Sequence, residues 1–586
     1  MSDFASTPIN LFEIDQPVCV NNYGIGACGA SIGDTGEHKC YNTYGTCQDR
    51  AAYDDTDSVL TIKFGIPSRD LPVAEHYIIP SVKKVSTTPT KINPGGRAGG
   101  ESPIGIRSTA TISLVDHPHS DLLVDPYLDD RAHSPLETGT FWAKWIKRNP
   151  FNNGYKCRVV EGFAGQSIEE MQSREYMIDR VNGPDSSGNV TIKCVDILRK
   201  ADKRKALVPS VTTGELSTAI SQSAVSLVLT GANIDQYSSY GTNAIRINDE
   251  VIRYASLVVN GSGNLEFSGL SRGSDNTQAA AHDAGDTAQA CLHYVSQTPW
   301  GVTHDLLVNF AGIDGDYINF TSWSDECSVW LSGMTVTRLI TEPVGVDGLI
   351  GELCEQCGFY IWYDEISRSI EIKAIRPPDS SVPLLTDDRN LIKNSVQVKT
   401  KPELRCSEVW VSYGQKTPIS DTGKRSSYKS TLARIVDDNP YNERVVYDIF
   451  SPWLESQAQA DLLAFRVLSR YTAPPKYVTF SLHIKDRELL SVGDPFDILS
   501  QSFVDNLGFP EVRRFQVISM HEAPAGERIN IQGQEFEYDV GHRVSHWMVD
   551  AAPVYTLASD LERETGMFWA DDDGRMSDGD TGYVWS

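Results

Sequence analysis

Four cysteines near the N-terminus are the residues whose type and spacing could do chemistry: Cys19, Cys28, Cys40 and Cys47. Eight, eleven and six residues separate them, and the next cysteine is Cys157. Clustered thiolates are the ligands of structural zinc and of iron–sulfur clusters. The intervening segment is rich in Gly, Asn and Thr and poor in Leu and Ile, so it has loop chemistry and little apolar core. Something other than apolar burial must hold this segment together.

The spacing of the four cysteines bears on which metal they would hold. Structural zinc sites usually contain two close Cys-x₂₋₄-Cys pairs, and none occurs among these four. Cluster ligands tolerate wider, irregular spacing because a cubane is larger than one ion. The spacing therefore favours an iron–sulfur cluster, with zinc as the alternative. Thiols without a ligand, or two disulfides formed after lysis, are a further interpretation.

The compartment also bears on the cysteines. The first thirty residues lack a basic start followed by an apolar core, and no run of eighteen apolar residues occurs, so we expect neither a secretion signal nor a membrane span. We expect synthesis in a cytoplasm, where the eleven cysteines would be reduced. Cys354 and Cys357 form a CxxC, but its helical apolar spacing predicts core packing.

The length, composition and net charge of the chain limit which classes of protein it can belong to. A chain of 586 residues predicts several domains, and its 40% hydrophobic and 22% charged residues are typical of globular proteins. The net charge of −26 argues against a large sequence-independent grip on nucleic-acid phosphates. An acidic surface suits a protein that stays soluble before assembly, or one lining a channel through which DNA slides, which we state as a hypothesis.

The elements that must position the cysteines are mainly strands. Short β-branched and aromatic runs such as VLTIKF, STATISLVDH and YKCRVVEGF alternate with turn residues. We predict a multidomain, mainly β protein with an α+β part, divided as follows: a cysteine-rich, metal-bound module (1–57), a first β-barrel (58–207), an inserted small β domain (208–295), an α+β domain (296–393), a second β-barrel (394–540) and an acidic C-terminal arm (541–586).

Signatures of catalysis are absent from the sequence. We find no HExxH, no GxSxG, no GxxxxGK[ST] and no GxGxxG that opens a helix after a strand. His117 and His119, with Asp116 and Asp121, could be imagined as metal ligands, but a polar turn after a strand explains them more simply. The same holds for His282. We therefore expect a protein that is not an enzyme.

Longer pieces of the chain carry a family resemblance. The segment KCYNTYGTCQD and, after it and in order, IGIRSTATISLVDHPHSD, DPYLDDR, GTFWAKWIKRNPF, VNGPDSSGNVTIKCVDIL, RGSDNTQAAAHDAGD and ELCEQCGFYIWYDE resemble segments of siphophage tail-tip hub proteins. The resemblance spans most of the chain from Cys19 to about Tyr538. The chain is similar in particular to the tail hubs of lambda-like phages and gene transfer agents.

That resemblance implies a structural hub of the tail tip, or baseplate, of a long-tailed phage. Two β-barrel hub domains would form a homotrimer that closes the tail tube, connects it to the tip fibre and opens for ejection of the genome. It also implies an iron–sulfur cluster, expected to be 4Fe–4S, coordinated by Cys19, Cys28, Cys40 and Cys47. We expect the protein in the virion tail tip, assembled in the host cytoplasm.

The resemblance also implies partners. They would be further copies of the chain, a distal tail protein, a tape measure protein and a central tail fibre or spike protein. The protein would contact DNA only while the DNA passes through the channel. It would contact the host envelope only indirectly. The alternatives from other classes are a tail-associated cell-wall hydrolase and a receptor-binding tip protein, for which the inserted domain near Asn260 would be the surface.

The metal assignment has a direct test. Anaerobic purification is expected to give a brown protein with stoichiometric iron and acid-labile sulfide, because thiolate-bound clusters absorb visible light. Iron, sulfide and zinc are measured on the same sample. A colourless preparation that contains zinc would contradict the iron assignment.

Overall fold

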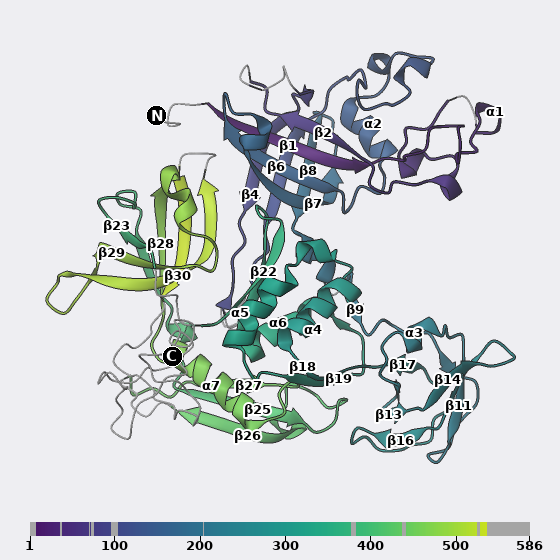
Figure 1. Ribbon diagram of the computed structural model, residues 1–586, viewed down its shortest axis with the longest axis vertical. Coiled ribbons are helices and arrows are strands. Elements are labelled where there is room, and N and C mark those ends of the chain that lie inside the picture. The colour runs from purple at the N-terminus through teal and green to yellow at the C-terminus, as the bar shows by residue number, and fades with distance from the viewer. Residues whose placement is uncertain are drawn as a thin grey trace.

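The computed structural model describes residues 7–35, 38–68, 71, 76–94, 104–202, 204–376, 382–435, 441–523 and 528–535. Strands dominate this part of the chain, in eight sheets accompanied by seven short α-helices, so the mainly β expectation is confirmed. Figure 1 shows an N-terminal sheet, a C-terminal sheet, a central part with most of the helices, and an inserted β unit. No helix in the described ranges is long and apolar enough to cross a membrane. The expected acidic arm, 541–586, lies outside them.

The N-terminal sheet has eight strands, paired antiparallel apart from the parallel β2–β3 pair. Alternate residues of its strands are buried, for example Ala110, Ile112 and Leu114, as expected when one face covers a core. In sheet order the strands are β3 (Ile78–Ile79), β2 (Val59–Gly65), β1 (Pro8–Pro17), β6 (Lys156–Phe163), β7 (Gln172–Asn182), β8 (Asn189–Val195), β5 (Thr109–Val115) and β4 (Val82–Thr88).

This sheet is rolled. Its edge strands β3 and β4 are separated in the chain by Pro80 and Ser81 alone, and three peptide steps span at most about 11 Å. The two edges must therefore come close together. Among the described residues no ladder joins them, so the closed first barrel that we expected is not confirmed: the edges are connected by the chain and not by hydrogen bonds.

The core of the rolled sheet contains helix α2 (Phe141–Arg148). Trp142 and Trp145 of α2 are 0% and 2% exposed. Their indole nitrogens donate to Ser81 Oγ and Gln16 Oε1, each at 2.9 Å, so these buried polar groups are paired. The helix thus fills the rolled sheet and binds two of its segments.

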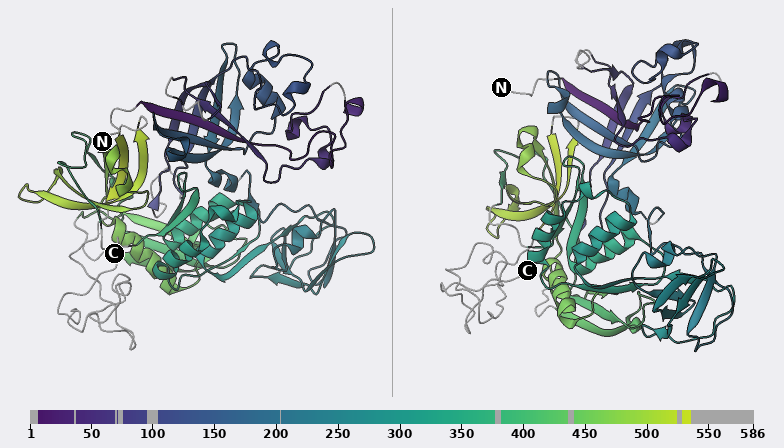
Figure 2. Two further views of the ribbon diagram at one scale, coloured as in Figure 1. Left: turned by 45° about the horizontal axis from the view of Figure 1, so that its top comes forward. Right: turned by 45° about the vertical axis from the view of Figure 1, so that its right-hand side comes forward.

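The inserted unit has two four-stranded antiparallel sheets around its own core. The first contains, in order, β10 (Glu215–Leu216), β11 (Ser226–Thr230), β15 (Leu265–Ser268) and β14 (Ser256–Val259), and the second β16 (Ser271–Ser274), β13 (Glu250–Arg253), β12 (Ala244–Ile247) and β17 (Ala288–Ala290). A single turn of helix, α3 (Asp235–Ser238), accompanies them. In both views of Figure 2 this unit projects from the central helices.

The central part combines helices with small sheets in one large core. Its helices are α4 (Pro299–Asp305), which continues as a π-helical turn over Leu306–Phe310, α5 (Phe320–Trp330), α6 (Val346–Cys357) and α7 (Gln457–Tyr471). Its strand pairs are β18 (Leu292–Gln297) with β19 (Val336–Ile340), β9 (Leu207–Val208) with β20 (Val344–Gly345), and β21 (Phe359–Asp364) with β22 (Ser369–Ala374). Cys354 and Cys357 of α6 are 1% and 0% exposed, which confirms that this CxxC packs in the core.

The region expected to form a second barrel contains two separate sheets. A three-stranded sheet, β26 (Tyr428–Ile435), β25 (Glu408–Gln415) and β27 (Val446–Phe450), shares the central core. A six-stranded sheet has its own core and contains β23 (Leu384–Thr386), β29 (Pro495–Val504), β30 (Pro510–Ala523), β31 (Arg528–Glu535), β28 (Lys476–His483) and β24 (Gln397–Thr400). Closure of the six-stranded sheet is not confirmed, since no described ladder joins β23 to β24.

The N-terminal sheet, the six-stranded sheet and the central part meet at one junction. Arg174 of β7 donates to Glu522 of β30 at 2.5 Å, and the backbone nitrogen of Glu175 donates to the carbonyl of Glu365 at 2.8 Å. Ile92 donates its backbone N–H to the carbonyl of Ile518 at 2.9 Å. These contacts are long-range in sequence, so the three parts hold one another in position.

Removing the Trp142 side chain tests the role of α2 as a core element. Trp142→Ala is expected to lower the free energy of unfolding of the N-terminal sheet by about 3–5 kcal/mol, because it opens a cavity and removes the indole N–H that Ser81 Oγ accepts. Urea unfolding followed by circular dichroism measures this, with Leu136→Ala as the control, since Leu136 is 56% exposed. Equal midpoints for the two variants would contradict the assignment.

Candidate metal centre

The four cysteines lie on one long loop between β1 and β2. Pro17 pairs with Val59, and Val18 donates its backbone N–H to the carbonyl of Ser58 at 3.1 Å, so residues 18–58 leave the sheet and return to the same place. We name this segment the cysteine loop. The structure places residues 8–17, which we assigned to the module 1–57, in β1 of the N-terminal sheet. Figure 1 shows the loop beside α2.

Asn42 brings the first and third cysteines together. Cys19 donates its backbone N–H to the carbonyl of Asn42 at 2.8 Å, and Asn42 Nδ2 donates to the carbonyl of Cys19 at 3.5 Å. The Cys40 thiol donates to Asn42 Oδ1 at 3.4 Å. Asn42 has a φ of 52°, a left-handed conformation that asparagine tolerates better than most residues.

The other two cysteines are tied to the same place by turns. Cys47 donates its backbone N–H to the carbonyl of Tyr44 at 3.3 Å, which closes a short helical turn. The backbone nitrogen of Gly29, next to Cys28, donates to Asp49 Oδ2 at 2.8 Å. This contact joins the Cys28 segment to the chain just after Cys47.

The charges of the other thiols act on two of the four cysteines. Burial raises the pKa of Cys40, and the charges of Cys47, Cys28 and Cys19 raise it further. Burial also raises the pKa of Cys47, with contributions from Cys19 and Cys28. Such charge effects fall off with distance, so the four cysteines lie in one neighbourhood of the loop. All four carry free thiols, and Cys40 is 8% exposed.

Arg131 fixes the cysteine loop from outside. Its guanidinium donates to the carbonyls of Lys39 and Cys40, at 2.6 and 2.9 Å, and it binds both carboxylate oxygens of Asp125. Burial opposes the charge of Arg131, but the hydrogen bond to Asp125 and its charge more than offset this, so the pKa of Arg131 is raised. Arg131 is thus a permanent cation next to the cysteine backbone.

An aromatic contact adds a second cation. The Tyr41 ring lies between the guanidinium groups of Arg131 and Arg148, at 3.9 and 3.8 Å from its centroid. Thr43 also donates its hydroxyl to the carbonyl of Arg148 at 2.7 Å. Two cations beside a set of thiolates offset the negative charge that the set would carry.

The donor set can be compared with the groups it would hold. Among the described residues no group of three or more His, Cys, Asp and Glu is arranged so that it could hold a metal ion. Cys40 and Cys28 pack with Tyr23, Ala30 and Tyr127, and thiolates are the ligands of both zinc and iron–sulfur clusters, so the donor type fits either group.

Other residues with possible chemistry are placed in structural networks. Asp121 is 2% exposed and accepts from Lys144 at 2.8 Å and Arg148 at 2.7 Å, while His119 Nε2 bonds to the hydroxyl of Tyr77 at 2.8 Å. His282 lies buried against Glu250 at 2.8 Å. These contacts place both histidines in buried polar networks.

Arg131 and Asp125 are among the residues of the site that we did not assign from sequence. Both lie in DPYLDDR, a segment that carried the family resemblance without a role. An arginine flanked by several aspartates is a weak signal, because acidic residues are abundant in this chain. Their function becomes visible once the fold brings residues 125–131 against residues 39–40.

Comparison with known proteins gives distant likenesses. No family model matches the chain, and no curated protein matches it. Among solved structures, a tail protein from Neisseria meningitidis MC58 is similar with a TM-score of 0.37 and 10% identity, covering 77% of this chain and 97% of that one. The prophage MuSo2 43 kDa tail protein from Shewanella oneidensis gives 0.36 and 11%, with the same coverage.

A third solved structure, the virion of a native gene transfer agent particle, gives a TM-score of 0.29 and 16% identity, covering 42% of this chain and 48% of that one. These TM-scores are below the level at which a shared fold follows. The likenesses therefore assign neither a fold nor a function to this chain.

Truncating Arg131 tests its role in the cysteine loop. Arg131→Ala is expected to speed proteolytic cleavage within residues 18–58, because it frees two loop carbonyls and leaves buried Asp125 without its counter-ion, at a cost of about 3–5 kcal/mol. Lys39→Ala is the control, since it removes the partly exposed ion pair with Asp130 from the same loop. Cleavage rates that are equal in both variants would rule out an anchoring role for Arg131.

Proposed function

We propose that this chain is a structural hub of the tail tip of a long-tailed bacteriophage. A homotrimer would close the tail tube, connect it to the tip fibre and open for ejection of DNA. The observation that carries the proposal is the gathering of Cys19, Cys28, Cys40 and Cys47, the residues of the resembled motif, on one anchored loop. The mainly β, multi-sheet architecture supports it.

The same residues would hold an iron–sulfur cluster, of the 4Fe–4S type by the resemblance. The role that fits the site is structural: metal–thiolate bonds supply folding free energy to a loop with little apolar core. The chain's own residues contribute the rest. Asn42 orients Cys19 and Cys40, and Arg131 holds the backbone of Cys40. Zinc is the alternative metal for the same four cysteines.

An exposed hairpin tip supports the proposed self-association. Between β29 and β30 the chain turns at residues 505–509, where Leu507 is 82% and Phe509 65% exposed. Exposed apolar side chains that lie together suit a surface that a partner covers. In the proposed assembly they would contact a neighbouring copy. The further partners proposed are the distal tail protein, the tape measure protein and a central fibre or spike, with DNA passing through the channel.

Removing one cysteine of the motif tests this function. Phage carrying Cys40→Ser are expected to assemble tails with defective tips and to lose infectivity, because the loop loses one of its four thiolates. Tails are examined by negative-stain electron microscopy and infectivity by plaque counts. Cys291→Ala, which removes a buried thiol outside the loop, is the control and is expected to remain infectious.

Normal tails and normal infectivity in the Cys40→Ser phage would refute an essential structural role for the cysteine loop. Native mass spectrometry of the purified chain provides an independent readout of the trimer.

A further inference from the structure

A cavity of about 470 Å³ lies where the inserted unit joins the central part. Its lining comes from the segment after α3, from β18 and from α4 with its π-helical turn. The volume is within the range of small-molecule sites. π-helical turns are rare and occur frequently at functional sites. The cavity is remote from the cysteine loop in sequence and shares no residue with it.

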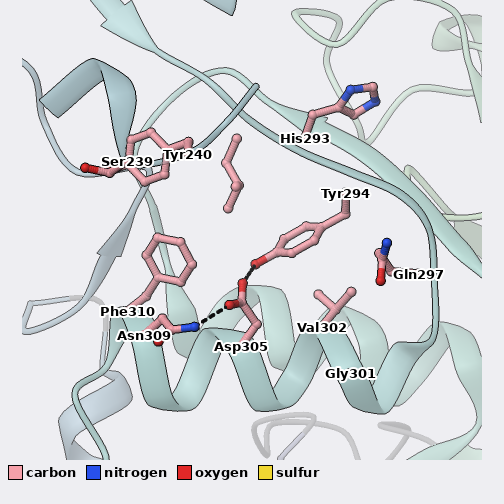
Figure 3. Close-up of a pocket in the computed structure, with 11 residues that line it drawn as sticks. Ser239, Tyr240, His293, Tyr294, Gln297, Gly301, Val302, Asp305, Asn309 and Phe310 are labelled. Atoms are coloured by element: carbon pink, nitrogen blue, oxygen red, sulfur yellow. Dashed lines mark hydrogen bonds between the residues drawn. The ribbon is translucent and has the colours of Figure 1, made fainter. Parts of the chain in front are cut away.

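A fixed acceptor group lies at the floor of the cavity. Tyr294 donates its hydroxyl to Asp305 Oδ2 at 2.6 Å, and Asn309 Nδ2 donates to Asp305 Oδ1 at 2.6 Å (Figure 3). Each carboxylate oxygen has two lone pairs, so each keeps a further acceptor position. Burial and the Asp305 charge raise the pKa of Tyr294, which keeps its hydroxyl a donor. The carboxylate is thus oriented before any ligand binds.

Aromatic rings form the walls. Tyr240 and Phe310 stack with ring centroids 5.9 Å apart and planes 16° apart. The hydroxyl of Tyr240 is held by the backbone nitrogen of Ser210 at 2.8 Å, which fixes this ring. Figure 3 shows this pair on one side of Asp305 and the Tyr294 ring on the other. A ligand between them meets apolar ring surfaces at its sides and acceptors below.

The charge of the lining limits the class of ligand. Asp305 is the formally charged residue of the lining, and the pKa of His293 is lowered by burial and by Arg253, so His293 is neutral at pH 7. An anionic ligand would be repelled by Asp305 without a cation to compensate. The amides of Asn309 and Gln297 add polar groups that both donate and accept.

We propose that this cavity binds an uncharged hexose unit. A pyranose ring has C–H faces that pack on aromatic rings and equatorial hydroxyls that donate to a fixed carboxylate, which matches walls and floor. The unit could be a free sugar or part of a surface polysaccharide, since the recognised chemistry is the same. This inference rests on the cavity alone and does not require the hub function.

The test is saturation-transfer-difference NMR on the full chain, followed by titration. The neutral probes are methyl α-D-glucopyranoside, methyl β-D-galactopyranoside and N-acetyl-D-glucosamine. N-acetylneuraminic acid tests anions, and putrescine tests cations. A neutral polysaccharide, dextran, distinguishes a chain-bound unit from a free sugar. We expect at least one neutral glycoside to show saturation transfer and N-acetylneuraminic acid to show none.

Variants locate the binding. Asp305→Asn and Phe310→Ala are each expected to lower the affinity for the glycoside at least about tenfold, as is found for central contacts of a binding site. Phe320→Ala is the matched control, because Phe320 is a partly exposed ring on α5 outside the cavity. Asp305→Asn preserves shape, so it remains informative if Phe310→Ala fails to fold.

Three outcomes would overturn the proposal. One is the absence of saturation transfer for every neutral probe. Another is glycoside binding that neither Asp305→Asn nor Phe310→Ala weakens. The third is binding of putrescine alone, lost in Asp305→Asn, which would make the cavity a cation site. None of these outcomes bears on the trimer or on the cysteine loop, so the two proposals fail independently.

Discussion

The N-terminal half of the protein depends on the pairing of β1 with two partners. β1 pairs with β2 on one side and with β6 on the other, so residues 8–14 are joined to residues 157–163. This long-range pairing builds the rolled sheet and sets where the cysteine loop begins and ends. Closing a loop as long as residues 18–58 costs chain entropy, and the loop has little apolar surface to offset that cost. The free energy must come from polar contacts and from thiolate chemistry.

Besides the contacts within the loop, one neighbouring segment supplies such polar contacts. Arg131, Asp125 and Arg148 belong to residues 125–148, which include α2, the helix that fills the rolled sheet. The same α2 thus serves the core of the sheet with its tryptophans and the cysteine loop with its last turn. A change in the sheet core that shifts α2 would therefore also displace the residues that anchor the cysteine loop, although the cysteines lie outside that core.

Part of this architecture could be predicted from the sequence, and the features that could not be predicted have physical reasons. The cysteine loop, the β-rich composition and core packing of Cys354 follow from local pattern. We assigned β1 to the same module as the cysteines, because the sequence does not show that β1 pairs with β6, which lies far away in the chain. The strands of residues 408–450 alternate like barrel strands, but the pattern alone does not show which core they cover. They cover the central core, which also contains the helices. The cavity is assembled from Tyr240, Tyr294 and Asp305, which no motif connects. The domain boundaries remain predictions.

The central claim is that a four-thiolate loop stabilises a hub present in three copies at the tail tip. Cryo-electron microscopy of intact particles tests both halves in one map. The account predicts three copies of this chain closing the tail tube, with strong density between the sulfurs of Cys19, Cys28, Cys40 and Cys47. A map with a different copy number at the tip, or with four separate sulfurs and no density between them, would contradict it.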